Sequence, residues 1–307
     1  RKYRQLYGVE FYFVPSLEDW QTSYDNHRQA IKDAKSSKQK ESLSKEKTVI
    51  IADQEVEQGG HVIEDEEETK RSRGNKPEWK RYYHLVVVAK NRVGLGNLFT
   101  LVKKSYKYGF YRFPRIDYKM LKEHGEGLVV STACVGGLAS GLIYRQFSGM
   151  RFDELHPDLM NNLSDYNPIM SRLENMTDRF VDCVGQDNFF LEMQFNDLPA
   201  QHLTNRCLLD LSGKTGIPLI ATADSHFPDP QKWQARELYK KLGWMGAKLD
   251  QSMLPKEEDL KCKLYPKNAA QMWDEFKTKH LKKEFLIGQS NYVNHLLRTT
   301  SSITYAQ

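Results

Sequence analysis

An aspartate and a histidine, two residue types that often bind metal ions, stand two positions apart near the end of an apolar run. The run covers residues 217–223, and Asp224 and His226 follow it. In an extended strand, side chains two residues apart lie on the same face, so this carboxylate and this imidazole can share one cation. The alternative is that both residues cap the end of a strand, and the spacing alone leaves both interpretations open.

A thiol stands in a comparable position. Cys134 follows the apolar run 127–133 and precedes Gly136 and Gly137, so it is expected where a strand turns into a loop. Next to a cation the thiol would lose its proton and become a metal ligand. Without a cation, Cys134 would be a small buried apolar residue, which is the usual state of a free cysteine.

Glu10 and His84 are weaker candidates. Glu10 interrupts the apolar run 9–14, and a buried carboxylate there must be paired, hydrogen-bonded or metal-bound. Alternation along the strand also permits Glu10 to face solvent. His84 comes at the start of an apolar run, where a satisfied core histidine is the usual outcome. The other seven histidines have no partner at ligand spacing, and we interpret them as structural.

Strand and helix patterns alternate along the chain, which is typical of strand-helix units around a parallel sheet. The predicted strands are 6–14, 82–89, 127–133, 188–194 and 218–222, and the predicted helices include 95–108, 168–184, 200–214 and 231–242. Such units form either an open sheet or a barrel, and the pattern does not separate the two. In both, reactive side chains gather at the carboxyl ends of the strands, which suits Cys134 and Asp224.

Composition narrows the class of protein. The chain has 307 residues, 39% of them apolar, and a net charge of +5. This is enough to build a large α/β domain, and the small charge permits nucleic-acid contact without requiring it. No apolar run reaches the length of a membrane span, and no targeting segment is recognisable, so we expect a cytoplasmic protein without membrane contact. The four cysteines are widely spaced and predict free thiols.

A segment of different composition runs from about residue 27 to residue 80. It contains a Lys/Ser-rich stretch, an acidic stretch at 64–68 and a basic stretch at 70–73. Such a composition buries little apolar surface, so we predict a solvated and partly mobile insertion, with a small hairpin formed by 48–52 and 61–63. Residues 1–290, including this insertion, are predicted to be one domain, and 291–307 a linker.

Six ordered blocks of the sequence closely resemble the PHP domain of the alpha subunits of bacterial-type DNA polymerase III. The blocks are YGVEFY at 7–12, YHLVVVAKN at 83–91, GFYRFPRID at 109–117, GLVVSTAC at 127–134, FLEMQ at 190–194 and GIPLIATADSH at 216–226. The resemblance covers residues 6–250 apart from the insertion.

This resemblance implies a distorted (β/α)7 barrel that holds up to three divalent cations, zinc or manganese and possibly magnesium, at its strand ends. Glu10, His84, Cys134, Asp224 and His226 align with metal ligands of the family, and Asp224 and His226 with its catalytic groups. Arg115 is a candidate contact for a substrate phosphate. The family has four further ligands upstream of the Glu10 strand. We therefore expect an incomplete barrel and an inactive site in this chain alone.

By the same resemblance, the complete protein is a replicative DNA polymerase subunit of a bacterium or a phage, with metal-dependent phosphoesterase activity, most simply 3′-5′ exonucleolytic proofreading. Its implied partners are DNA, the remaining polymerase segments, a sliding clamp and a proofreading exonuclease. The alternative is a catalytically inactive domain that stabilises the polymerase and docks a separate exonuclease. A small-molecule phosphatase shares the metal chemistry but not the blocks at 83–91 and 109–117, and ranks below both.

Overall fold

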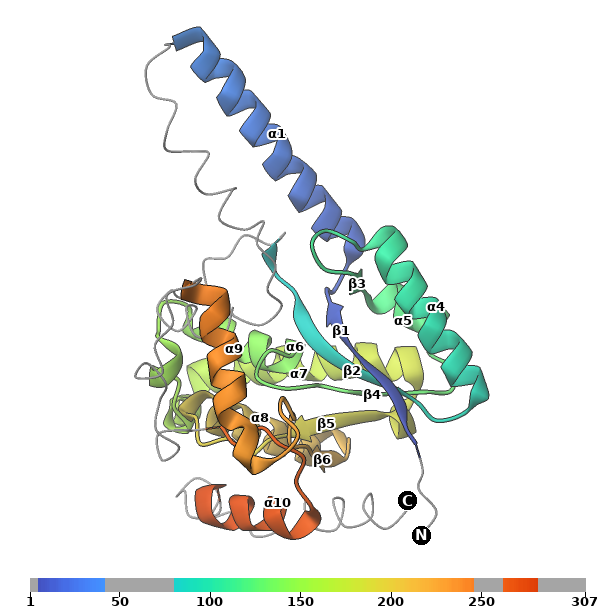
Figure 1. The fold of residues 1–307 in the computed structure, drawn as a ribbon, viewed down its shortest axis with the longest axis vertical. Helices are drawn as coiled ribbons and strands as arrows, with labels where there is room; N and C mark the ends of the chain where they lie inside the picture. Colours follow the sequence, from blue (N-terminus) through green and yellow to red (C-terminus); the bar gives the residue numbers. More distant parts are fainter. Residues whose placement is uncertain (1–4, 42–79, 246–261, 281–307) are drawn as a thin grey trace.

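The computed structural model describes residues 5–41, 80–245 and 262–280, and its centre is one mixed sheet (Figure 1). The strand order is β3-β1-β2-β4-β5-β6. The strands are β1 Tyr7–Phe13, β2 Tyr83–Ala89, β3 Arg115–Ile116, β4 Leu128–Ser131, β5 Phe189–Met193 and β6 Leu219–Ala221. Five of the six confirm predicted strands within a few residues, and β3 was not predicted.

The direction of β2 corrects the expected parallel sheet. It runs antiparallel to both of its neighbours, β1 and β4, whereas β1 with β3, β4 with β5, and β5 with β6 pair in parallel. The chain therefore enters β2 at the edge of the sheet where β1 and β4 end. Alternation of strands and helices indicates the elements but not their direction, which is why the sequence did not show this reversal.

Helices pack against the strands, among them α4, α6, α7 and α8. The α-helices are α1 Leu17–Glu41, α4 Arg92–Tyr108, α5 Tyr118–Glu123, α6 Leu138–Tyr144, α7 Leu163–Val184, α8 Pro199–Thr215, α9 Trp233–Met245 and α10 Ala269–Glu275. Short 3-10 helices cover Arg145–Phe147, Phe152–Glu154, Pro157–Asn161, Gln186–Asn188 and Pro230–Lys232, and a π-helical turn covers Phe276–His280. The four predicted helices are confirmed, although α7 begins five residues before the predicted start and includes Pro168.

Helix α1 crosses the predicted start of the insertion. It begins where Ser16 Oγ accepts a hydrogen bond from the backbone N–H of Asp19 (3.1 Å) and Asp117 Oδ2 accepts one from that of Leu17 (3.0 Å), and it continues to Glu41. Residues 27–41 are thus helical, because a polar composition suits a solvated helix as well as a loop, and the limits of the insertion stay a prediction. The predicted hairpin at 48–52 and 61–63 lies outside the described residues.

The alternation of side chains along β1 and β2 separates a core face from an opposite face. Phe11 and Phe13 of β1, and Leu85 and Val87 of β2, are almost fully buried. Side chains at the intervening positions lie on the other face of the sheet and remain partly accessible. This two-residue period is what directs the polar side chains of β1 and β2 to one side.

A buried histidine pair attaches the π-helical turn to α8. His202 Nδ1 lies 3.1 Å from His280 Nδ1, and His202 Nε2 lies 3.0 Å from Asp197 Oδ1. Burial lowers the pKa of His280 to about 3, and the nearby His202 lowers it as well. His280 is therefore neutral at neutral pH. The two histidines are 78 residues apart, so no local sequence pattern indicates this contact.

No disulfide joins any of the four cysteines, which confirms the prediction. Within the described ranges, no helix is both long enough and apolar enough to span a bilayer.

Candidate metal centre

Glu10 and His84 reach one another across the β1-β2 pair. Tyr12 lies opposite His84 in the register, and Glu10 lies opposite Val86, so Glu10 and His84 are diagonal neighbours on the same face of the sheet. Diagonal pairs are within reach of long side chains. The Glu10 carboxylate closes the gap, because its Oε1 lies 2.8 Å from His84 Nδ1.

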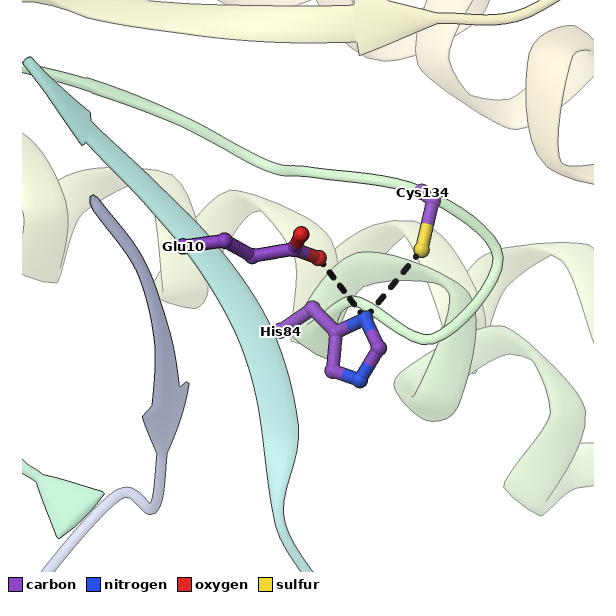
Figure 2. Close-up of side chains that lie close together, drawn as sticks. All are labelled: Glu10, His84 and Cys134. Carbon is purple, nitrogen blue, oxygen red and sulfur yellow. Dashed lines mark hydrogen bonds and ion pairs between the residues drawn. The ribbon is translucent and has the colours of Figure 1, made fainter. Parts of the chain in front are cut away.

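The Cys134 thiol meets the same imidazole nitrogen. Its Sγ lies 3.4 Å from His84 Nδ1, and one ligand atom from each of Glu10, His84 and Cys134 lies within 4.8 Å of the other two. Figure 2 shows the three side chains converging, Glu10 from β1, His84 from β2 and Cys134 from the loop after β4. The structure thus brings together three of the five predicted ligands.

The loop after β4 is fixed against the start of β2. Ala133 adopts a left-handed conformation (φ 59°), which turns the chain, and the backbone N–H of Gly136 donates to Cys134 Sγ (3.3 Å). The backbone N–H of His84 donates to the carbonyl of Gly136 (3.0 Å). A Cβ atom at Gly136 would lie 3.0 Å from His84 Nδ1, so glycine permits this close approach. The thiol and the imidazole are therefore held in place by backbone contacts as well as by their own.

The antiparallel direction of β2 explains why His84 belongs to the site. Ligands were expected at the carboxyl ends of strands, and His84 is near the start of its strand. Because β2 is reversed, its start lies at the edge where β1 and β4 end. Sequence pattern alone therefore argued against His84, and only the family resemblance indicated it.

The three donors suit a divalent cation. A carboxylate, an imidazole and a thiolate together are a donor set that favours zinc, while the carboxylate also admits manganese or magnesium. The side chains of His84 and Glu10 are 29% and 45% exposed, so an ion and a substrate can reach them. The sequence left open whether Glu10 is paired or faces solvent. In the structure it is paired with His84 and is also partly exposed.

Asp224 and His226 lie in the loop beyond β6 and are not members of this close group. β6 ends at Ala221, and Asp224 has a left-handed backbone (φ 47°), so strand alternation does not place the two side chains. His226 Nδ1 lies 2.7 Å from the carbonyl oxygen of Asp224 and 3.9 Å from its Oδ1. Among the described residues, the group within 4.8 Å contains Glu10, His84 and Cys134 only. The role of Asp224 and His226 as metal ligands stays a prediction.

A buried glutamate that sequence reasoning missed connects the two parts of the predicted ligand set. Glu192 of β5 is 5% exposed and accepts hydrogen bonds from Ser131 Oγ at the end of β4 and from Thr222 Oγ1 just beyond β6 (2.5 Å each). Burial raises the pKa of the Glu192 carboxyl, against the effect of its hydrogen bonds, and the charge of Asp224 raises it further. Ser131 precedes Cys134 by three residues and Thr222 precedes Asp224 by two. Glu192 therefore joins the strand ends from which both loops leave.

Arg115 is enclosed by the protein. It is 2% exposed, and its Nη1 donates to the carbonyl oxygens of Tyr111 (2.8 Å) and Phe113 (2.7 Å). Its guanidinium carbon lies 4.8 Å from the ring centroid of Trp20 and 5.7 Å from that of Tyr82. These contacts support the loop before β3. A role in phosphate binding stays a prediction to which these surroundings add no support.

Two other thiols are poor ligand candidates. Burial raises the pKa of Cys183 to about 11, and burial also raises that of Cys207. Both thiols are protonated at neutral pH and would bind a metal weakly.

Comparison with known proteins identifies the region that contains Glu10, His84 and Cys134. A family model described as "PHP domain" matches residues 2–196. DNA polymerase III subunit alpha of Aquifex aeolicus is 34% identical over 163 residues, which cover 53% of this chain and 12% of that protein. The subunits of Borreliella burgdorferi and Treponema pallidum are 31% and 29% identical over 197 and 180 residues. The chain thus aligns with only 12–15% of the length of these relatives.

Proposed function

The chain belongs to the PHP domain family, and on that premise we propose that it is the PHP part of a replicative DNA polymerase alpha subunit and works as a metal-dependent phosphoesterase. The proposed reaction is hydrolysis of a phosphodiester at the 3′ end of a DNA strand. The observation that carries the proposal is the convergence of Glu10, His84 and Cys134 from three segments that are distant in sequence. The barrel of seven strand-helix units is part of this proposal.

In this proposal Glu10, His84 and Cys134 hold one divalent cation, and Asp224 and His226 complete the site. A bound cation supplies a water molecule of lowered pKa and stabilises charge on a phosphate. The chain itself contributes position. The contact of Glu10 with His84 Nδ1 fixes the imidazole ring, and the N–H of Gly136 stabilises negative charge on Cys134 Sγ. Cys134 must be a thiolate in order to bind.

Asp224 and His226 are the proposed catalytic pair. Their loop follows β6, which pairs in parallel with β5 and so ends at the same edge as β4. The side chains are 20% and 39% exposed, so both are accessible to a substrate. In the proposed reaction, the imidazole of His226 transfers a proton, and Asp224 orients the imidazole ring.

The wider setting is proposed from the relatives. DNA, the remaining polymerase segments, a sliding clamp and a proofreading exonuclease are the proposed partners, and the cytoplasm is the proposed location. Up to three ions of zinc, manganese or magnesium are the proposed cofactors. The domain limits 1–290 and 291–307 also stay predictions.

A second candidate function is a domain that stabilises the polymerase without catalysis. It is favoured by the contact of His226 with its own neighbour Asp224, outside the close group of three donors. In that case, a cation at Glu10, His84 and Cys134 would stabilise the fold only.

Metal analysis and a nuclease assay separate these functions. We would measure bound zinc and manganese, and release of 3′ nucleotides from a labelled primer, for the chain and for the chain extended by the upstream segment of its relatives. His84→Ala and Cys134→Ala are expected to lose metal and nuclease activity together, whereas Cys183→Ala retains both. Metal binding without nuclease activity in the extended protein, or absence of metal binding, would contradict the phosphoesterase function and favour the structural role.

A further inference from the structure

Helix α4 exposes aromatic side chains to solvent. Phe99, Tyr106 and Phe110, the last just after the helix, are 64%, 59% and 54% exposed. The rings of Tyr106 and Phe110 stack with their centroids 5.8 Å apart and their planes at 17°. Exposed apolar side chains that gather in one place commonly mark a binding surface. In Figure 1, α4 lies along the margin of the fold.

Lysines alternate with these rings. Lys103 and Lys107 are exposed on the same helix, which contains no acidic residue at all. Lys104 forms an ion pair with Glu123 (2.8 Å), whereas neither Lys103 nor Lys107 forms one with any residue that the structure describes. Relative to the described part of the chain, the α4 surface therefore carries two positive charges without a carboxylate partner.

These lysines also lower the pKa of a neighbouring side chain, the phenol of Tyr108. A hydrogen bond with Lys107 and the positive charge of that residue lower the pKa of Tyr108, and Lys104 and Lys103 contribute to the same effect. The surface thus favours negative charge.

The rings and charges form one stripe because of their spacing. Positions 99, 103 and 106 follow steps of four and three, which place them on one face of the helix. Phe110, just after the helix, joins this face through the stacking of its ring on Tyr106. The opposite face carries Leu98, Leu101 and Ser105, which are buried against the core. Phe99 and Tyr106 are about 10 Å apart along the helix axis. We call Phe99, Lys103, Tyr106, Lys107 and Phe110 the α4 stripe.

Two kinds of macromolecule could cover such a surface. A protein segment would have to supply acidic groups and apolar side chains in matching order. In single-stranded nucleic acid, every nucleotide carries a phosphate, which can pair with a lysine, and a base, which can stack on an aromatic ring. A duplex fits less well because its bases already stack on one another. The alternation of cations and flat rings therefore favours a single strand.

We propose that the α4 stripe binds single-stranded nucleic acid, with bases stacked on Phe99 and on the Tyr106-Phe110 pair and phosphates bound by Lys103 and Lys107. This surface is separate from the residues of the metal centre, and it would work without a bound cation. The inference goes beyond the proposed phosphoesterase function and does not depend on it.

Binding to a fluorescein-labelled 20-nucleotide oligothymidylate tests the proposal. The probe is titrated with the 307-residue chain in EDTA at several salt concentrations, and its anisotropy gives Kd. Combined replacement of Phe99, Tyr106 and Phe110 by alanine is expected to weaken binding by at least about tenfold. Lys103→Gln with Lys107→Gln is expected to flatten the slope of log Kd against log salt concentration by about 1.4.

Matched controls and a second readout make the test decisive. Leu163→Ala and Lys232→Gln remove an exposed apolar side chain and an exposed charge elsewhere, and are expected to leave Kd unchanged. Circular dichroism checks that each variant is folded. Failure of the probe to bind, or equal Kd values for parent and stripe variants, would overturn the proposal. Sedimentation that shows self-association abolished by the aromatic replacements would also overturn it, and would assign the stripe to a second copy of the chain.

Discussion

Replacing Glu192 is expected to loosen both the fold and the metal centre. Glu192→Leu keeps most of the side-chain volume but removes the acceptor of the buried Ser131 hydroxyl and of the half-buried Thr222 hydroxyl. An orphaned buried donor costs about 1–3 kcal/mol, so loss of the Ser131 bond is expected to lower the free energy of unfolding by about that amount, and the Thr222 hydroxyl, which solvent can reach, adds less. Glu192→Gln resembles the protonated acid and can still accept a hydrogen bond, so its cost is expected to be about 1 kcal/mol.

Urea denaturation followed by circular dichroism measures these changes, with Glu126→Leu as the control at an exposed glutamate. Zinc titration measures the effect on the site, because the loop that carries Cys134 leaves β4 directly after Ser131. We expect weaker zinc binding for Glu192→Leu and nearly parental binding for Glu192→Gln. Equal stability of Glu192→Leu and the parent, or equal losses for the leucine and glutamine variants, would refute the proposed bridging role of this carboxylate.

Three further predictions concern the other groups described above. Cys134→Ala is expected to weaken zinc binding by at least about tenfold, measured by competition with a chromophoric chelator, while Cys183→Ala leaves it unchanged. Gly136→Ala is expected to displace the His84 ring and weaken zinc binding by about tenfold with little change in thermal stability; unchanged affinity would contradict the close approach. The pKa of His280 lies below its ordinary value of 6.5, so the folded state binds fewer protons than the unfolded state between pH 6.5 and about 3. The free energy of unfolding should therefore fall with decreasing pH in this window, by up to about 1.4 kcal/mol per pH unit, and denaturation curves of His280→Gln should lack that slope.

The sequence predicted most elements because apolar runs are a local property. The strands around Glu10 and Cys134 and the helix before Tyr108 were placed within a few residues. Strand direction is not local, and so β2 was assigned the wrong orientation. Helix α1 was not predicted, because its sequence is polar and the Asp117 side chain that accepts a hydrogen bond at its start is 100 residues away from Leu17.

The site was predicted in the same uneven way. Cys134 was recognisable from its position after a strand, and Glu10 from the cost of burying a carboxylate. His84 had only the family resemblance in its favour. Glu192 lies in a recognised block, but its partners Ser131 and Thr222 are 61 and 30 residues away, and no local pattern indicates them.

Helix α1 is long and is held to the fold near its start. Its 25 residues correspond to a rod about 37 Å long, and in Figure 1 most of that rod projects from the body of the fold. Near the start of the helix, Trp20 packs against the guanidinium of Arg115. Arg115 in turn lies near Tyr82, whose ring stacks on His84 at 6.4 Å. A sideways force on the outer end of α1 would thus act through these stacked side chains on His84 of the candidate metal centre.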